Sequence, residues 1–295
     1  METPKISVVI PTYNRPNLLS RAIESVINQT YTDYECLVVD DASPADSLSA
    51  VDNFDDDRIQ YFEHETNQGA SAARNTGIAN SKGDYIAFLD DDDEWLPTKL
   101  EKQMKLFQDQ PDDIGLLYTW MDYRKQSGEL VRTYDPTHSG YIFPHMLDGQ
   151  RIGSCSTLVV RTEVARKVGG FDENLPRGND GDFIRRVSRE YKVEYVPEVL
   201  VNYYVEHDSD RITREDEQGI RNAIHGKQTK LRKFNEELKQ YPKRKAMIHS
   251  NLGRRYGLVG EYKNSIQSHY CAFKTSPRTL EVYKNMARTI RDILF

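Results

Sequence analysis

The chain has 295 residues, enough for one large α/β domain with an appendage or for two ordinary domains, which excludes a peptide-sized or disulfide-stapled scaffold. Hydrophobic residues make up 38% of the chain and include 18 Tyr and 10 Phe, while 29% charged residues and a mean hydropathy of -0.72 indicate a very polar surface, so global disorder is excluded. The net charge is -6, and no apolar run approaches the ~20 residues of a membrane helix or forms a secretory signal, so we expect a cytoplasmic protein.

Short apolar segments alternate with helical patterns over the first hundred residues. A β-branched run at 6–10, ended by Pro11, is typical of a buried strand, and the apolar spacing at 18–27 predicts a helix that Asn14 or Asn17 could cap. Further strands are predicted at 34–39, 58–62 and 85–89, and further helices at 70–79 and 99–107. This alternation predicts a mostly parallel sheet whose ligands bind beyond the carboxyl ends of the strands.

The remainder of the chain changes character near residue 214. Before this point, strands predicted at 115–119 and 156–160 lie between Gly- and Pro-bearing loops, and their topology stays open. Residues 214–295 read as helical and carry 18 Lys and Arg against 8 Asp and Glu, a net charge of +10 that leaves -16 for residues 1–213. We therefore predict an acidic α/β domain at 1–213 and a basic helical region at 214–295. The acidic domain argues against nucleic acid as a partner, because phosphate backbones are bound by an excess of Lys and Arg.

Four consecutive aspartates, Asp90 to Asp93, follow the predicted strand at 85–89. Adjacent carboxylates repel one another, so keeping them ionised in a crevice requires a countercharge. A hard divalent cation supplies it, since Mg²⁺ and Mn²⁺ bind through one or two carboxylates together with substrate phosphates. The alternative is a solvated acidic loop.

Two further segments place polar residues beside predicted strand ends or helices. Asp41 follows the strand at 34–39, where a carboxylate can accept hydrogen bonds from a uracil imide or ribose hydroxyls, although a turn or helix cap explains it equally. The segment that begins with Asn67 contains Gly69, where the backbone must bend or approach closely, and Arg74, which can reach a phosphate. Taken alone, that segment is a capped helix.

Four motifs in this order and spacing carry a resemblance to a known family. They read SVVIPTYNR at 7–15, DDAS at 40–43, NQGASAARNTG at 67–77 and GDYIAFLDDDDEW at 83–95. The chain closely resembles the family 2 glycosyltransferases over residues 5–210, which is about 70% of its length. The resemblance implies a GT-A fold, a Rossmann-like α/β domain with a mixed, mainly parallel sheet, to which the C-terminal helical region is appended.

The resemblance also assigns residues to the donor site. It implies that Thr12 and Tyr13 line the base pocket, that Asp41 contacts uracil, and that Asp91 contacts the ribose. Asp90 and Asp92 match the outer members of the Asp-x-Asp motif, with Asp92 the direct metal ligand. The full predicted nucleotide-sugar set is Pro11, Thr12, Tyr13, Asn14, Arg15, Asp41, Asn67, Gly69, Arg74, Asp90 and Asp91.

Two later segments resemble the family's catalytic elements. Family members carry a Glu-Asp pair before an apolar helix, with Asp as the base; here the pair reads Asn179-Asp180, so Asp180 is the predicted base and Asp182 its competitor. Helix capping is the alternative for both. His207 resembles a family histidine that approaches the diphosphate or the metal, so the predicted metal set is Asp92, Asp90 and His207.

Together these residues predict an inverting glycosyltransferase that depends on Mn²⁺ or Mg²⁺. The donor would be a nucleotide-diphosphate sugar, a UDP-sugar in the first instance, and the acceptor the hydroxyl of a glycan or lipid-linked glycan. One alternative is a nucleotidyltransferase, which would release pyrophosphate instead of UDP. The other is a non-catalytic sugar-nucleotide-binding protein, which would be expected to lack the aspartates or the base.

The last segment, 278–295, predicts a basic amphipathic helix. Its apolar face is Leu280, Tyr283, Met286, Ala287, Ile290, Ile293 and Leu294, with Arg278, Lys284, Arg288 and Arg291 elsewhere around the helix. Such a helix can lie on an anionic leaflet, which would make the protein peripheral on the inner face of the membrane. The alternative is that this face packs onto the catalytic domain.

Overall fold

The computed structural model describes residues 4–109, 111–205 and 216–294, and the chain divides into two compact units. The first unit comprises Met1–Ile142, Arg151–Glu173 and Phe183–His207. The second comprises Phe143–Gln150, Asn174–Asp182 and Asp208–Phe295. Besides the C-terminal region, the second unit therefore includes two short segments from the middle of the chain.

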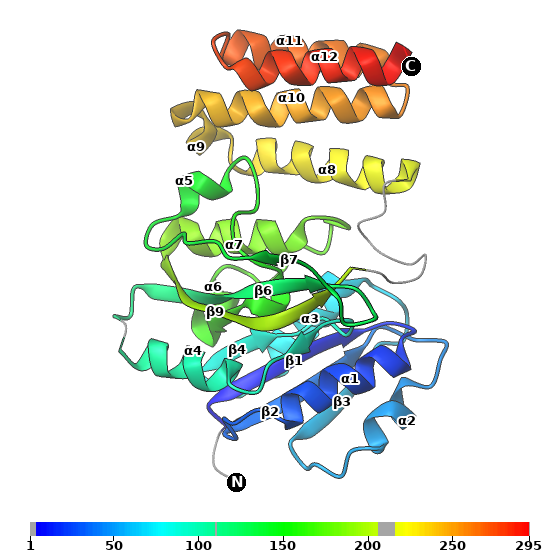
Figure 1. Ribbon diagram of the computed structural model, residues 1–295, viewed down its shortest axis with the longest axis vertical. Coiled ribbons are helices and arrows are strands. Elements are labelled where there is room, and N and C mark those ends of the chain that lie inside the picture. Colours follow the sequence, from blue (N-terminus) through cyan, green and yellow to red (C-terminus); the bar gives the residue numbers. More distant parts are fainter. Residues whose placement is uncertain (1–3, 110, 206–215, 295) are drawn as a thin grey trace. The chain divides into compact units, whose positions relative to one another are not determined.

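A mixed sheet forms the centre of the first unit (Figure 1). In the described residues it has nine strands in the order β3-β2-β1-β4-β8-β6-β9-β5, with β7 paired to β6. The bounds are β1 (Ile6–Thr12), β2 (Tyr34–Asp40), β3 (Ile59–Glu63), β4 (Tyr85–Phe88), β5 (Glu94–Trp95), β6 (Ile114–Arg124), β7 (Leu130–Tyr134), β8 (Val159–Arg161) and β9 (Lys192–Tyr204). The pairs β3/β2, β2/β1, β1/β4 and β6/β9 are parallel, and the other pairs are antiparallel.

The predicted mainly parallel sheet is confirmed in its first four strands. Every residue of β1, β2 and β4 is buried, as expected of parallel strands covered on both faces. Helices of this unit are α1 (Pro16–Ile27), α2 (Ser47–Asp52), α3 (Ala70–Asn80), α4 (Lys99–Gln108) and α6 (Thr162–Lys167), together with most of α7 (Asn179–Glu190). The carboxyl ends of β1, β2 and β4 lead directly into the segments predicted to bind a ligand.

Three local predictions are wrong. Strand β1 does not end at Pro11 but continues to Thr12. Helix α1 has Arg15 at its N-cap and proline at its first turn, so neither Asn14 nor Asn17 caps it, and Asn14 instead turns the chain with a φ of 57°. The strand predicted at 156–160 begins only at Val159, because Cys155–Thr157 forms a 3₁₀ turn, η1.

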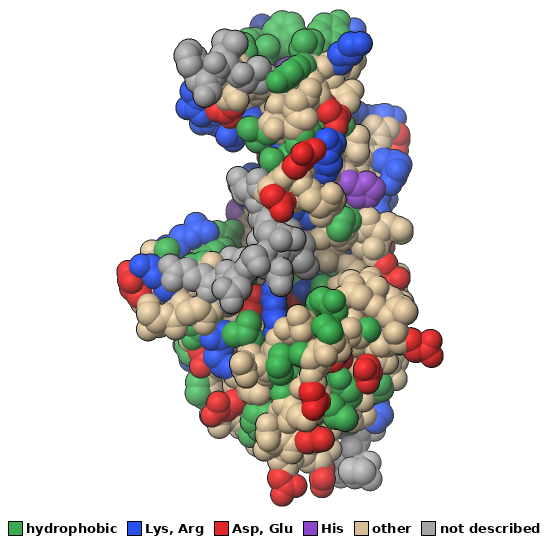
Figure 2. Space-filling view, turned by 90° about the vertical axis from the view of Figure 1, so that its right-hand side faces the viewer, with side chains coloured by type: hydrophobic (Ala, Val, Ile, Leu, Met, Phe, Trp, Pro, Cys, Tyr) green, Lys and Arg blue, Asp and Glu red, His purple; other side chains and the backbone are tan. Residues whose placement is uncertain are grey.

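The second unit is helical. It contains α5 (Phe143–Met146), α8 (Glu217–Lys233), α9 (Asn235–Gln240), α10 (Pro242–Leu258), α11 (Tyr262–Thr275) and α12 (Leu280–Leu294), and the first turn of α7 (Figure 1). Phe143, Leu147, Phe234, Leu238 and Ile248 form one apolar cluster, and a smaller one joins α10, α11 and α12. Hydrophobic side chains also gather on the outer surface of α11 and α12, at the top of Figure 2. Within the described ranges, no helix has the length and apolar character needed to cross a membrane.

Candidate nucleotide and metal site

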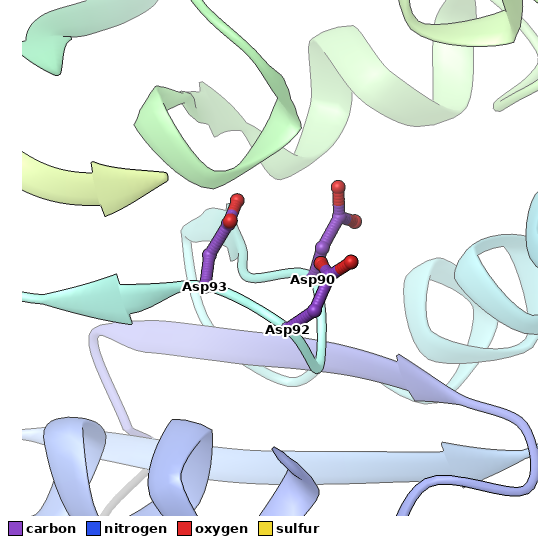
Figure 3. Close-up of side chains that lie close together, drawn as sticks. All are labelled: Asp90, Asp92 and Asp93. Carbon is purple, nitrogen blue, oxygen red and sulfur yellow. The ribbon is translucent and has the colours of Figure 1, made fainter. Parts of the chain in front are cut away.

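The acidic turn after β4 brings three carboxylates together. Asp90, Asp92 and Asp93 each offer one oxygen, and these three oxygens lie within 4.8 Å of one another (Figure 3). The turn is closed by the amide of Asp93, which donates to the carbonyl of Asp90 at 3.1 Å. A single turn therefore presents three hard oxygen ligands on one side, an arrangement suited to a divalent cation.

Asp93 is the buried member of this cluster. Its side chain is 0% exposed, its Oδ2 accepts a hydrogen bond of 2.5 Å from the Ser156 hydroxyl, and its Oδ1 has no hydrogen-bond partner in the described residues. Burial first, and then the charge of Asp92, raise the pKa of Asp93 well above its ordinary value. A buried oxygen without a partner beside two further carboxylates fits a bound Mg²⁺ or Mn²⁺. Asp93 thus joins the predicted ligands Asp90 and Asp92, whereas His207 lies outside the described residues.

Asp91 has different surroundings and is not part of the cluster. It is 5% exposed, accepts a hydrogen bond from the Thr12 hydroxyl at 2.8 Å, and lies 3.3 Å from Nη1 of Arg15. Burial, and next the charge of Asp92, raise the pKa of Asp91 to about 7, although Arg15 acts in the opposite direction. Asp91 therefore ties the acidic turn to the end of β1.

Two arginines supply countercharge to the acidic turn. Nη1 of Arg15 lies 3.2 Å from Asp92, and Nη2 of Arg74 lies 2.5 Å from Asp90. The countercharge predicted from the sequence was a cation alone, but in the structure the protein itself neutralises part of the cluster. Both arginines were predicted to bind the nucleotide. Arg15 reaches the turn from the start of α1, and Arg74 reaches it from within α3.

The carboxylate of Asp41 faces inward and shapes the loop that precedes α3. Its Oδ1 accepts from the Gln68 amide at 2.8 Å and from His64 at 2.8 Å, and its Oδ2 accepts from the Gly69 amide at 2.6 Å. Gly69 has a φ of 91°, in the left-handed region that favours glycine, which allows both amides to turn toward one carboxylate. A contact between Asp41 and the base stays a prediction.

The remaining residues predicted to bind the nucleotide sugar lie around the same strand ends. Pro11 is buried in β1, Asn14 donates its amide to the Ser43 hydroxyl at 2.7 Å, and the ring of Tyr13 is 45% exposed. The Asn67 side chain is exposed and makes no hydrogen bond within the described residues. The structure therefore joins Thr12, Arg15 and Arg74 to the acidic turn, while Tyr13 and Asn67 project from its surroundings.

Asp180 belongs to the second unit, in the first turn of α7. It is half-buried, and its Oδ1 accepts a hydrogen bond from the Gly181 amide at 2.6 Å, while Asn179 Oδ1 accepts from the Asp180 amide at 2.8 Å. Asp182 is 1% exposed and pairs with Lys233 at 3.0 Å. The two competing carboxylates thus differ, since Asp182 is bound within the helical unit and Asp180 is the more accessible.

Sequence reasoning missed two residues that hold the acidic turn. Ser156 is fully buried and also accepts a hydrogen bond from the Asp90 amide at 3.1 Å, so that one hydroxyl fixes two members of the cluster. Nη2 of Arg21 donates to the Asp92 carbonyl at 2.6 Å while its guanidinium lies 3.9 Å from the centre of the Tyr204 ring. Both approach from distant parts of the chain, and no motif or spacing marks them.

Replacing Ser156 with alanine is expected to weaken Mn²⁺-dependent UDP binding by ~10-fold or more, the usual scale for residues that orient metal ligands. Removal of the hydroxyl leaves Asp93 Oδ2 without its hydrogen-bond donor and the Asp90 amide without its acceptor. Titration calorimetry with UDP and Mn²⁺ would measure the loss of affinity. Ser154→Ala is the matched control, because the Ser154 hydroxyl is buried without a hydrogen-bond partner in the described residues. Equal affinities of the two variants would contradict a positioning role.

The raised pKa of Asp91 predicts a pH-dependent stability. The folded protein binds this proton more tightly than the unfolded chain, so the free energy of unfolding should fall as pH rises from the ordinary 3.8 to about 7. We expect Asp91→Asn to flatten this fall. Thermal unfolding of both proteins in a chelating buffer between pH 5 and 8 measures it, and superimposable pH profiles would show that Asp91 is ionised throughout.

Comparisons with known proteins identify the family of this chain. The model of the Glycosyl transferase family 2 matches residues 7–167. An uncharacterized glycosyltransferase of Methanocaldococcus jannaschii is 32% identical over 225 residues, which cover 72% of this chain and 75% of that protein. The chain therefore belongs to the family 2 glycosyltransferases.

Other relatives share only part of their length with this chain. The GalNAc(5)-diNAcBac-PP-undecaprenol beta-1,3-glucosyltransferase of Campylobacter jejuni is 45% identical over 105 residues, 35% of this chain and 34% of that protein. In three uncharacterized glycosyltransferases of Rickettsia, the matched part makes up 25% to 29% of the protein. These matches therefore do not assign the activity or the substrates of those proteins to this chain.

Solved structures show the same fold. The chain resembles S. aureus TarS 1-349 in complex with UDP-GlcNAc with a TM-score of 0.70 and 16% identity, covering 98% of this chain and 89% of that one. It resembles the mannosyltransferase PcManGT of Pyrobaculum calidifontis, in complex with GDP-Man and Mn²⁺, with a TM-score of 0.62 and 18% identity, covering 100% and 82%. The predicted GT-A fold with C-terminal helices is confirmed.

Proposed function

We propose that the protein is a metal-dependent, inverting glycosyltransferase that transfers a hexose from a UDP-sugar to a hydroxyl of a glycan or lipid-linked glycan. The observation that carries the proposal is the cluster of Asp90, Asp92 and Asp93, joined to Arg15 and Arg74 at the carboxyl ends of parallel strands in a family 2 chain. Sugar-nucleotide complexes of the structural neighbours support a donor of this class, and a lipid-linked glycan relative supports the acceptor class.

The charges of the acidic turn favour joint binding of metal and donor. Three carboxylates face two arginines here, and the diphosphate of a nucleotide sugar brings negative charge that a divalent cation offsets. Asp90, Asp92 and Asp93 would hold the cation, whose chemistry when bound is to stabilise charge on the departing diphosphate. Arg15 and Arg74 would exchange their carboxylate partners for phosphate oxygens, which keeps each guanidinium paired.

Asp180 would act on the acceptor. Its carboxylate takes the proton of the acceptor hydroxyl as the oxygen forms a bond to the anomeric carbon, and the bond between that carbon and the diphosphate breaks on the opposite face. The result is a glycoside of inverted configuration and UDP. Asp182 serves this role less well, because its carboxylate is buried and paired with Lys233.

A screen of nucleotide sugars for hydrolysis with Mn²⁺ or Mg²⁺ tests the proposal, since slow transfer to water identifies the donor without an acceptor. We expect release of UDP from one UDP-sugar and none after chelation. Pyrophosphate as the product would support the nucleotidyltransferase alternative. Binding without turnover, with an acceptor extract supplied, would support the non-catalytic one.

A further inference from the structure

The two last helices of the second unit leave most of their large apolar side chains exposed and bury several polar ones. On α11, Ser265, Ser268 and His269 are buried, whereas Tyr262, Ile266, Tyr270 and Phe273 are 42% to 71% exposed. On α12, Asn285 and Thr289 are buried, whereas Leu280, Tyr283 and Ile290 are 44% to 67% exposed. An ordinary helix of a globular protein shows the opposite distribution.

This arrangement corrects the face predicted for the last helix. Only Met286 of the predicted apolar residues packs against the cluster of Ala246, Ala272 and Val282, and the side chains of Ile293 and Leu294 lie outside the described residues. Besides this small apolar cluster, the buried side is held by polar contacts, among them a 3.0 Å hydrogen bond between His269 and Thr289. Packing inside the unit therefore does not account for Leu280, Tyr283 or Ile290.

The exposed residues form one continuous surface, which we call the α11/α12 face. Residues 262, 266, 270 and 273 follow one stripe of α11, since they are three or four positions apart. Residues 280, 283 and 290 follow one stripe of α12, and the rings of Phe273 and Tyr283 meet edge to face at 6.2 Å, which joins the two stripes. In Figure 2, hydrophobic side chains gather at the top of the view, where these helices lie, and Lys or Arg side chains are visible beside them.

Cations surround the α11/α12 face. Residues 262–292 contain six Lys and Arg and two acids, Glu281 and Asp292. Both acids are already paired, Glu281 with Arg288 at 3.1 Å and Asp292 with Arg254 at 3.1 Å. In the described residues Lys263, Lys274 and Arg278 have no carboxylate partner, so the rim of this face is positive. A second copy of the chain would set these cations against their counterparts, whereas an anionic surface complements them.

We propose that the α11/α12 face is a docking surface for an anionic lipid leaflet. Ile266, Phe273, Leu280 and Ile290 would enter the boundary between headgroups and acyl chains, and the tyrosines would lie at the headgroup level, where aromatic rings with a polar tip are favoured. Lys263, Lys274 and Arg278 would meet the anionic headgroups. This agrees with the peripheral attachment predicted from the sequence, with a surface built from two helices in place of one.

Cosedimentation of the full chain with vesicles tests this proposal, and it needs neither donor nor metal. We expect binding to vesicles with 30% phosphatidylglycerol in phosphatidylcholine, weakening from 50 mM to 500 mM salt, and little binding to phosphatidylcholine alone. Neutralising two cations in Lys263→Gln/Lys274→Gln should weaken binding about 25-fold, at about fivefold for each cation near the surface. Lys105→Gln/Lys243→Gln removes the same charge from α4 and α10 and should change binding less than about twofold.

A second variant tests the apolar contribution. Ile266→Ser/Ile290→Ser should weaken vesicle binding by about tenfold or more, because each loses a side chain that would be buried in the leaflet. Both positions are exposed, so the variant should keep the unfolding temperature of the wild type. Salt-insensitive binding to both vesicle types would overturn the proposal. So would absence of vesicle binding together with self-association that the same variant abolishes, which would make the face a contact between two copies. UDP-sugar hydrolysis should be unchanged in all these variants, so failure here leaves the proposed activity standing.

Discussion

Replacing Asp92 with alanine is expected to lower the affinity for UDP in the presence of Mn²⁺ by more than about 100-fold, beyond the range caused by changes around a metal site, because it removes a charged ligand itself. Asp92 is, with Asp90, one of the two carboxylates that were predicted to bind the metal and that lie in the cluster. It belongs to the three-carboxylate cluster, and it is the residue that Arg15 approaches at 3.2 Å. Titration calorimetry with UDP, with and without Mn²⁺, measures the loss.

The same variant should not be less stable without metal. The charge of Asp92 raises the pKa of both Asp91 and Asp93, so its removal relieves repulsion inside the folded protein, and the ion pair it gives up is partly exposed and contributes little. If Asp92→Ala loses UDP affinity but keeps the unfolding temperature of the wild type, Asp92 is a metal ligand and not a residue that stabilises the fold. Asp57→Asn on an exposed turn is the control for the loss of one negative charge. Wild-type UDP affinity in Asp92→Ala would show that Asp92 is not a metal ligand.

The parallel half of the sheet could be predicted from the sequence because its signal is local. β1, β2 and β4 are short and mostly apolar, as is typical of strands buried on both faces. Beyond β4 the signal weakens. β6 and β9 pair over register shifts, and Ser156 sits in a 3₁₀ turn within an apolar stretch, so neither periodicity nor turn residues mark the topology.

The candidate site shows the same division. Residues at strand ends, such as Thr12, Asp41 and the acidic turn, could be placed because parallel strands deliver their carboxyl ends to one edge. The partners that fix them could not. Ser156 reaches Asp93 across 63 positions, and His64 reaches Asp41 across 23, and such contacts follow from packing in three dimensions alone. Asp93 could not be singled out as a ligand in the sequence because it is one of four consecutive aspartates. Its full burial and its Oδ1 without a hydrogen-bond partner in the described residues distinguish it in the structure.

Changing Asp180 to asparagine is expected to lower kcat of sugar transfer by ~100-fold or more, the scale for losing a general base, while UDP binding with Mn²⁺ stays near that of the wild type. Asparagine keeps the size of the side chain and can still accept from the Gly181 amide, so only the basicity is lost. Single-turnover transfer from the donor found by hydrolysis, together with calorimetry, separates chemistry from binding.

Asp182→Asn is the matched comparison, because it changes the same group two residues further along α7. Its carboxylate is buried and paired with Lys233, so we expect a loss of about 2 kcal/mol in the free energy of unfolding, with kcat falling much less than in Asp180→Asn once the protein is folded. Lys233→Gln should reproduce that instability without touching either aspartate. Full transfer by Asp180→Asn, with an inactive but stable Asp182→Asn, would move the base to Asp182 and would mean that the Lys233 pair opens when the acceptor binds.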